Sequence, residues 1–510
     1  MLQSQRLIMP TAEVLRIYRD LEGNQYPQIF SKSLTKNPIT HPNPNARPNS
    51  LSIEDAFFGD SGKGSIIAKF NEVLMQNGRL YSIRYNGGAN AGHEADINEK
   101  KIVTHQIPMA IVKEGATAFI TRGMVLNPED GLAEIDYIKE ALGVTELPGN
   151  LIIDQNTPLA LGTHRAYETV LNEVASEGRG STGRGIAPAY MEVYGRTAKT
   201  VRDLMAEDWE EKLRNHYLLY QRLIKGFGRD LEDIDVYTMK NQAKRKVGTE
   251  QEFIERLEEV RTRLSPYVAT NVFDLLNEAW NNNLRIPFTI EGAQGAGLDP
   301  YHGVYPDVSA GRPMSRNIND ATYNVILPEE IAFRAAAMKT TYMSSVGQRR
   351  LPLNKTEAYE KHAKRIQEEF DERGRSTGRL RDIYPISIPI AQYLQRAAGY
   401  QYLVATHLDA SWEGEEFEVI VGYEDKTTGK ESPYMPYQED LDKLKPITVK
   451  FKGWDGEGVK QIRSPEDLPY ETRLYLAFLS KTIAPVAFGT TGPELGSYIS
   501  WINLSRPIDK

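Results

Sequence analysis

Short apolar segments alternate with longer amphipathic segments along most of this chain. From Leu51 onward the apolar runs have strand length, and the stretches between them carry apolar residues at helical spacing. The runs that predict strands are 51–58, 80–85, 117–120, 151–153, 286–291, 402–406 and 484–488. The stretches that predict helices are 64–75, 133–142, 209–224, 249–265, 272–281, 328–337 and 355–369. This alternation predicts an α/β fold, a single large domain with a mostly parallel central sheet flanked by helices.

Two segments depart from this alternation. Residues 1–50 combine a helical pattern at 11–21 with a Pro- and Asn-rich stretch at 37–49, which is typical of an N-terminal arm or linker. The main domain would then span residues 51–510. Within it, residues 413–452 are charged and strand-like, which predicts a small β-rich surface subregion.

Composition narrows the class of protein. The chain has 510 residues, 40% hydrophobic and 25% charged, the balance of a globular protein with a sizeable core. The net charge of −8 argues against a nucleic-acid-coating role. Cysteine is absent, which excludes disulfides, zinc fingers and thiol catalysis. Neither a signal peptide nor an apolar run of membrane-spanning length is evident, so the expected location is the cytoplasm and no membrane partner is expected.

The sharpest motif is the loop 59–65, which reads GDSGKGS and lies between a predicted strand and a predicted helix. Its glycines let the backbone approach phosphate oxygens, the following helix offers N–H groups, and Lys63 adds a positive charge. The loop is P-loop-like rather than a standard P-loop, because Phe57 stands where the standard pattern has its first glycine. An ordinary tight turn is the alternative interpretation.

Three further segments place polar groups after predicted strands. Segment 84–93 reads RYNGGANAGH and ends at His93, which could act as a proton donor. Segments 291–295 (EGAQG) and 490–493 (TTGP) follow predicted strands, where ligands of open α/β sheets bind. Each of these segments alone is equally consistent with an ordinary turn.

Two arginine-containing loops complete the set. Segments 178–190 (GRGSTGRGIAPAY) and 373–381 (RGRSTGRLR) combine hydroxyl, amide and guanidinium groups. Such groups suit a phosphate, a polyphosphate or a small dicarboxylate, although a solvated surface loop is the alternative for each. All the segments together predict a site that handles several anionic ligands.

The order of these motifs resembles that of the adenylosuccinate synthetase family. The matching motifs are GDSGKG, RYNGGANAGH, STGRGIAPAY, EGAQG, STGRLR, THLD and TTGP. The resemblance covers residues 51–510 and implies a homodimeric carbon–nitrogen ligase of purine biosynthesis. It implies that GTP first phosphorylates O6 of IMP, and that L-aspartate then displaces this phosphate from C6.

The resemblance also implies catalytic roles. Asp60 would accept the N1 proton of the purine and bind Mg²⁺, and the carbonyl of Gly92 would be a second magnesium contact. His93 would favour charge development at O6, and Lys63 would stabilise the transferring phosphoryl group. The rest of the phosphate loop would be Gly59, Ser61, Gly62, Gly64 and Ser65.

The substrate contacts carried over from the family fall into three groups. IMP would contact Asn90, Thr182, Gln294 and Ser309, with Arg196 reaching over from the other subunit of the homodimer. Aspartate would be bound by Thr377, Arg379 and Arg381, whose guanidinium pair suits two carboxylates. The base of the triphosphate would contact His407, Asp409, Thr490, Gly492 and Pro493.

Several positions depart from the family pattern. The departures are Ser61 for a glutamate, Ala89 for a histidine, Ser309 for a threonine, His407 for a lysine, and Glu54 and Asp55 for an apolar and a small residue. The retained Asp409 can accept from guanine N1–H and N2–H₂, which favours GTP. Loss of the lysine at position 407 keeps ATP open.

Two alternative functions remain at this point. Some virus-encoded relatives act on dGMP with ATP and make N6-succino-2-amino-2′-deoxyadenylate, although their catalytic aspartate is often changed, whereas Asp60 is present here. A non-catalytic nucleotide-binding protein is the alternative from another class. The joint presence of Asp60, Lys63, His93, Arg379 and Arg381 argues against it.

Overall fold

The structure is a computed structural model of the whole chain. It describes residues 8–25, 27–29, 38–40, 42–75, 78–97, 100–174, 181–239, 243–345, 347–373 and 380–502. None of the helices in these ranges is long and apolar enough to cross a membrane.

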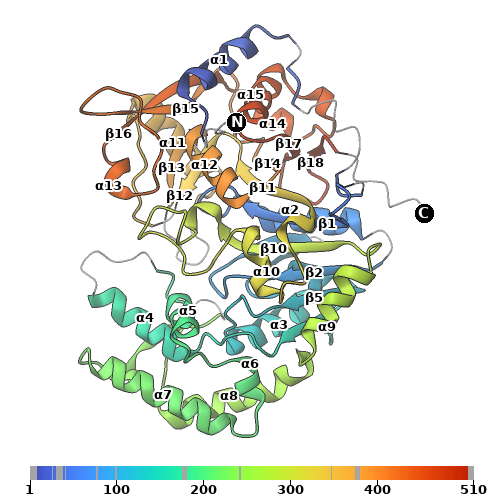
Figure 1. Cartoon of the computed structure of the whole chain (residues 1–510), viewed down its shortest axis with the longest axis vertical. Helices are drawn as coiled ribbons and strands as arrows, with labels where there is room; N and C mark the ends of the chain where they lie inside the picture. The colour runs from blue at the N-terminus through green and yellow to red at the C-terminus, as the bar shows by residue number, and fades with distance from the viewer. Residues whose placement is uncertain are drawn as a thin grey trace, which may run out of the picture.

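A ten-stranded sheet runs through the described part of the chain (Figure 1). In spatial order it contains β18 (Tyr498–Ser500), β17 (Val486–Thr490), β14 (Tyr402–Thr406), β11 (Ile331–Lys339), β1 (Arg47–Asp55), β10 (Phe288–Gly295), β2 (Leu80–Arg84), β5 (Ala116–Ile120), β6 (Asn150–Asp154) and β9 (Val268–Ala269). Neighbouring strands are parallel except at the β17–β18 edge. The predicted α/β class with a mostly parallel central sheet is confirmed.

Helices bury both faces of the half of the sheet that contains β1. On one face, α2 (Lys63–Leu74) packs Ile66, Ile67 and Phe70 against the buried apolar residues of β1, β11, β14 and β17. On the other face lie α12 (Ile388–Ala398) and α15 (Tyr470–Thr482). Burial on both faces explains the mainly apolar sequences of β14 and β17, whereas β1 also carries the buried polar residues Ser52, Glu54 and Asp55.

A helical layer lies at the opposite end of the molecule from α15 (Figure 1). It comprises α3 (Pro128–Leu142), α4 (Gly162–Val174), α5 (Ile186–Gly195), α6 (Val201–Met205), α7 (Trp209–Lys225) and α8 (Glu250–Leu264). Most of these helices share one apolar core with β5 and β6. Between α7 and α8 the chain forms the hairpin β7 (Asp235–Tyr237) and β8 (Lys244–Lys246), and α9 (Val272–Asn277) follows α8.

The β-rich subregion expected at 413–452 exists and is larger than expected. Its sheet contains β12 (Tyr342–Ser345), β13 (Asp382–Ser387), β15 (Glu416–Asp425) and β16 (Leu444–Lys452). The smaller elements around it are α11 (Glu357–Glu369), α13 (Gln438–Leu441) and α14 (Gly456–Val459). Elsewhere lie the hairpin β3 (His93–Ile97) and β4 (Lys100–Thr104) and the short helix α10 (Ile318–Ala321).

The N-terminal helix α1 (Thr11–Glu22) packs against α15 and β15. A side chain at Gly422 would collide with Thr11, because an added Cβ would lie 2.0 Å from the Thr11 hydroxyl. Strand β1 begins at Arg47, so the last residues of the segment 1–50 belong to the central sheet.

The helix predicted at 328–337 is wrong, because Ile331–Lys339 forms β11 beside the middle of the sheet. This segment reads IAFRAAAMK, and its alanines favour a helix in isolation. Pairing with β1 and β14 on either side overrides that local preference, because small side chains suit a strand covered on both faces.

Candidate active site at the carboxyl ends of the central strands

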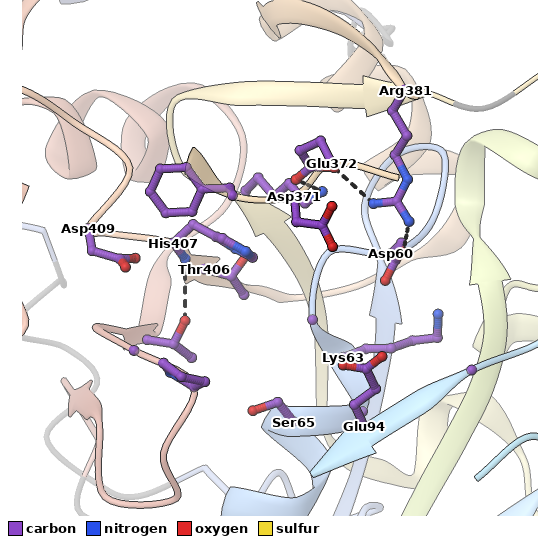
Figure 2. A pocket seen from close by; sticks show the side chains of 18 of the residues that line it. Asp60, Lys63, Ser65, Glu94, Asp371, Glu372, Arg381, Thr406, His407 and Asp409 are labelled. Carbon is purple, nitrogen blue, oxygen red and sulfur yellow. Dashed lines mark hydrogen bonds and ion pairs between the residues drawn. The ribbon is translucent and has the colours of Figure 1, made fainter. Parts of the chain in front are cut away.

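A cavity with a volume of about 270 Å³ lies where β1, β11, β14 and β17 end. Its lining residues are Asp60, Gly62, Lys63, Gly64, Ser65, Gly92, Glu94, Lys101, Lys339, Phe370, Asp371, Glu372, Arg381, Thr406, His407, Asp409, Thr490, Gly492 and Pro493. Predicted phosphate-loop, magnesium, aspartate and triphosphate-base residues therefore share one cavity, and Figure 2 shows several of them facing it.

The phosphate loop connects β1 to α2 through a strained turn. Gly59, Asp60 and Gly62 have φ angles of 92°, 57° and 82°, and Gly62 is the N-cap of α2. Only glycine adopts such angles freely, so Asp60 carries backbone strain. Two other non-glycine residues with positive φ lie at strand ends near the same edge, Gln294 and His407. Strain of this kind concentrates at functional sites.

An ion network crosses the cavity from Asp60 (Figure 2). Arg381 contacts Asp60 and donates to Glu372 Oε2 at 2.8 Å. Glu372 Oε1 accepts from the Tyr342 hydroxyl at 2.7 Å and also contacts the ammonium group of Lys339. Burial lowers the pKa of Arg381 to about 10. The pairing connects the predicted proton acceptor to a predicted aspartate-binding residue.

The other end of the cavity contains the predicted base-binding residues. The His407 N–H donates to Thr490 Oγ1 at 3.3 Å, which joins the ends of β14 and β17. The Phe370 ring lies edge-on to His407, with ring centroids 5.9 Å apart, and also lines the cavity. Burial raises the pKa of Asp409 to about 6, so this carboxylate is largely ionised at neutral pH. Phe370 adds an aromatic surface to this end of the cavity, which the motifs did not predict.

His93 lies apart from the cavity lining. Its ring is buried, with Nδ1 3.1 Å from Glu291 Oε2 and 3.2 Å from Arg84 Nη1. Burial and the positive charges of Arg84 and Lys63 lower the pKa of His93 well below its usual range. Its chain neighbours Gly92 and Glu94 line the cavity. The predicted acid therefore lies behind the wall formed by its neighbours.

Two residues predicted to bind the monophosphate have unsatisfied side-chain acceptor oxygens. Asn90 Oδ1 and Gln294 Oε1 are buried and form no hydrogen bond within the described residues. A buried unsatisfied acceptor is costly, which favours a ligand that donates to both atoms. The Ser309 hydroxyl accepts from the Gly311 N–H at 3.2 Å, so its oxygen is held by its own loop.

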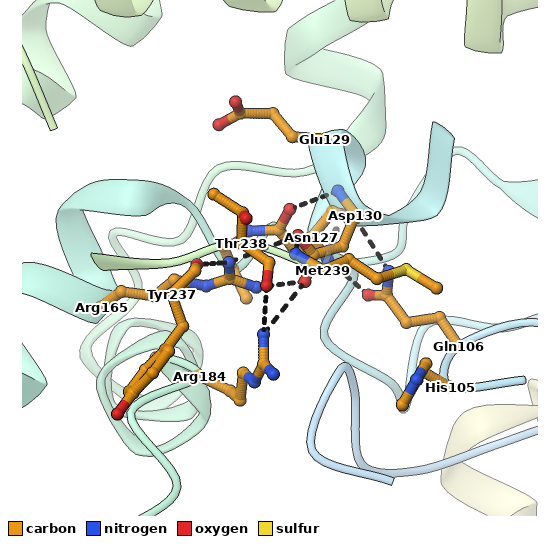
Figure 3. Close-up of polar contacts among 12 residues, drawn as sticks. His105, Gln106, Asn127, Glu129, Asp130, Arg165, Arg184, Tyr237, Thr238 and Met239 are labelled. Carbon is orange, nitrogen blue, oxygen red and sulfur yellow. Dashed lines mark hydrogen bonds and ion pairs between the residues drawn. The ribbon is translucent and has the colours of Figure 1, made fainter. Parts of the chain in front are cut away.

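Thr182 lies near the start of the described part of the loop 178–190. Arg184 holds this loop by donating to the Thr238 carbonyl at 3.2 Å (Figure 3). The Gly185 N–H donates to Glu168 at 2.7 Å. Arg196 is exposed at the end of α5 and lies outside the cavity lining. Of the aspartate-binding residues, Thr377 and Arg379 fall outside the described residues, and Arg381 is placed as stated above.

Sequence reasoning missed several residues of the cavity for identifiable reasons. Lys339 is the last residue of β11, and the mistaken helix at 328–337 concealed the carboxyl end of that strand. Glu372 lies just before the arginine loop, where its acidic character could have indicated a partner for Arg381. Glu94 and Lys101 come from the β3–β4 hairpin, which no apolar pattern predicted.

One further group of potential metal ligands lies away from this cavity. His164, Glu192 and His216 are buried with their donor atoms close together. The Leu161 N–H donates to His164 Nδ1 at 2.8 Å, so the proton of a neutral ring resides on Nε2, which faces Glu192 Oε2 at 3.0 Å. A protonated nitrogen cannot bind a metal. This group is therefore a hydrogen-bonded core cluster.

The cavity lining suits a divalent cation together with a polyphosphate. Its carboxylates are Asp60, Glu94, Asp371, Glu372 and Asp409, and its ammonium and guanidinium groups are Lys63, Lys101, Lys339 and Arg381. These charges do not by themselves neutralise a triphosphate. Asp60 and the Gly92 backbone offer oxygen ligands, which Mg²⁺ prefers, and the ion would supply the missing positive charge.

A loop with left-handed backbone angles joins a strand to a helix and opens onto a charged cavity. This arrangement is typical of nucleotide-binding α/β proteins. The family model for adenylosuccinate synthetase matches residues 53–499, and the chain belongs to this family, whose members are carbon–nitrogen ligases. A curated relative, the adenylosuccinate synthetase of Koribacter versatilis, is 32% identical over 442 residues, covering 86% of this chain and 92% of the relative.

Two solved structures have a similar fold. The fully ligated adenylosuccinate synthetase of Plasmodium falciparum has a TM-score of 0.75 at 23% identity, covering 89% of this chain and 99% of that one. The succinoaminodeoxyadenylate synthetase of cyanophage S-2L, bound to dGMP and dATP as an energy donor, has a TM-score of 0.52 at 15% identity. That match covers 90% of this chain and 96% of the phage protein.

Proposed function

We propose that this chain is an adenylosuccinate synthetase that joins L-aspartate to C6 of IMP, with GTP as the phosphoryl donor and a 6-phosphoryl intermediate. The observation that carries this proposal is the single cavity shared by the phosphate loop, Arg381 and the His407–Asp409 end. A ligase of this type needs the triphosphate, the purine and the amino acid side by side.

The chemistry assigns a task to each group around the cavity. Asp60 accepts the N1 proton while O6 attacks the γ-phosphorus and GDP leaves, and Lys63 stabilises the charge on the transferring group. The amine of aspartate then attacks C6, and inorganic phosphate leaves. Mg²⁺ held by Asp60 and the Gly92 carbonyl would neutralise the phosphates. His93 can assist only after its ring leaves the cluster with Arg84 and Glu291.

The substrate assignments combine the family pattern with the geometry of the described residues. Asn90 and Gln294 bind the monophosphate substrate through their unpartnered oxygens. Arg381 binds a carboxylate of aspartate, together with Thr377 and Arg379. The ionised Asp409 accepts from guanine N1–H and N2–H₂, which adenine lacks. Arg196 is exposed at the end of α5 and does not line this cavity, so we assign it to the other subunit of a homodimer.

The experiment is a phosphate-release assay on the purified chain with Mg²⁺ and aspartate, in which IMP or dGMP is combined with GTP or ATP. We expect aspartate-dependent release with IMP and GTP, and formation of adenylosuccinate. Release with dGMP and ATP alone would assign the aminoadenine reaction instead. Release without aspartate would indicate a simple triphosphatase, and no release from folded protein in any combination would indicate a binding protein.

A further inference from the structure

A buried carboxylate lies directly beneath the phosphate loop. Asp55 is the last residue of β1 and is fully buried. Its Oδ2 accepts from the Lys63 ammonium at 2.5 Å, and its Oδ1 accepts from the Ser61 N–H at 3.0 Å. Both donors belong to the phosphate loop. The Asp55 side chain therefore holds both the middle of the loop and Lys63 close to the end of β1.

The loop needs such a fastening because its own backbone is strained. Between Asp55 and Lys63 the chain adopts left-handed angles at Gly59, Asp60 and Gly62. The turn lies outside the regular strand and helix hydrogen bonds, so a side chain that accepts from one of its N–H groups helps to hold its shape. A carboxylate accepting one N–H bond and one ammonium contact supplies two charge-assisted bonds from a single position.

Asp55 also acts electrostatically on two other residues assigned to the reaction. Its negative charge opposes the effect of burial on the pKa of Arg381 and of His93. Asp55 therefore lies within electrostatic range of the proposed aspartate-binding arginine and the proposed acid, as well as in contact with Lys63. An ion pair that only stabilised the fold would not need to lie near all three of these residues.

The neighbouring acid gives a contrast within the same strand. Glu54 is equally buried, but its carboxylate accepts from the Ser315 N–H at 3.1 Å and contacts the Ser315 hydroxyl at 3.3 Å. Side chains alternate along a strand, so the two acids lie on opposite faces of the sheet. Of this adjacent pair, Asp55 is the one that contacts the phosphate loop.

We propose that Asp55 is a positioning residue of this active site, which holds the Lys63 ammonium and the Ser61 amide where the transferring phosphoryl group is stabilised. The inference deepens the proposed function and rests on it for the identity of the transferred group. Asp55 acts through Lys63 and does not line the cavity itself. Ser61 stands where the family pattern has a glutamate. This chain therefore lacks that carboxylate within the loop and has the Asp55 carboxylate beneath the loop instead.

The first test needs no turnover. Limited acetylation of the native chain, read peptide by peptide by mass spectrometry, compares Lys63 with Lys101, which lines the same cavity with a half-exposed side chain. We expect slow modification of Lys63 in the parent chain and a rise of about tenfold in Asp55→Asn, because an ion pair of this kind is worth more than about 1.4 kcal/mol. Equal rates for Lys63 and Lys101 in the parent chain would overturn the inference even if the variant failed to fold.

The second test separates positioning from simple destabilisation. In Asp55→Asn we expect kcat to fall about 30-fold, since misplacing a catalytic group by about 1 Å costs up to about 100-fold, while the aspartate KM stays near the parent value. The matched control Glu54→Gln removes a neighbouring buried charge and should keep the parent kcat at neutral pH. An unchanged kcat in Asp55→Asn would overturn the inference, as would a fall that merely follows the lost folded fraction.

These outcomes are distinct from failure of the proposed function. A parent chain that releases no phosphate with any substrate pair would refute the synthetase assignment. The acetylation rates would still show whether Asp55 restrains Lys63. A parent chain that is active while Asp55→Asn matches it in both kcat and Lys63 acetylation would refute the role of Asp55 alone.

Discussion

Two ion networks in this molecule consist of the same residue types, arginines paired with acids, but differ in their surroundings. In the cavity network, Arg381 links Asp60 to Glu372 at the edge of an open space. In the second network, which we call the hub, Arg165 and, from the segment 178–190, Arg184 contact Asp130, with Arg165 Nη1 3.3 Å from Asp130 Oδ1 (Figure 3). All three of these arginines are more than nine-tenths buried.

The two networks differ in whether their charged groups are accessible to a ligand. Asp130 also accepts from the Met239 N–H at 3.2 Å, and Arg165 contacts the Tyr237 carbonyl, so both carboxylate oxygens of Asp130 have protein partners. The carboxylate of Asp60 is over one-third exposed, lies on a strained backbone and faces the cavity. Burial of charge alone therefore does not identify a functional site. Open space and backbone strain beside the charge distinguish the network that we assign to catalysis from the hub.

The largest expected effect comes from Asp60→Asn in the cavity network. We expect kcat to fall by about 10³-fold, because the side chain can no longer take the N1 proton. Arg381 retains Glu372, so the thermal midpoint should change little. Steady-state kinetics and calorimetry on the same preparation check both statements. Full activity in this variant would remove Asp60 from the role of base.

Arg165→Met should affect the hub in the opposite way. Removing one member of a buried ion pair leaves Asp130 short of a partner and should lower the free energy of unfolding by about 3 kcal/mol. Urea denaturation followed by circular dichroism measures this loss. The kcat of the folded fraction should stay near that of the parent chain. A large kcat loss at unchanged stability would reverse the distinction between the two networks.

Arg381→Met tests the cavity arginine against the hub arginine with the same substitution. We expect the aspartate KM to rise about 30-fold, corresponding to about 2 kcal/mol for a lost charge-assisted contact. The KM values for IMP and GTP should change much less. Glu372 keeps Lys339 and Tyr342, so the stability loss should be smaller than in Arg165→Met. Initial-rate kinetics with each substrate varied in turn provide the comparison.

The smallest effect on kcat is expected for Glu54→Gln, which removes a buried acid that belongs to neither network. Burial raises the pKa of Glu54 from 4.5 to about 8, so the folded chain keeps a proton that the unfolded chain releases. The free energy of unfolding should therefore fall as pH rises between these two values. Glu54→Gln cannot titrate, so it should gain stability relative to the parent chain across this window. Parallel denaturation curves that keep a constant separation from pH 5 to pH 8 would contradict this.

Local pattern predicted much of the fold. The strands at 80–85, 117–120 and 402–406 and the helices at 64–75 and 209–224 appear within a residue or two of their expected bounds. The failure at β11 arose because an alanine-rich segment carries little strand signal of its own. Only its two neighbours in the sheet make it a strand, and those lie far away in the sequence.

The chain by itself determined which chemical groups are available and in what order, because motifs such as GDSGKG and STGRLR are short and local. The tertiary structure decided which of these groups meet. It joined Arg381 to Asp60, placed His93 behind the cavity wall, and turned Asp55 toward Lys63. These outcomes depend on strand order, on the face to which each side chain points, and on which charges are desolvated together. None of these quantities is encoded in a local window of sequence.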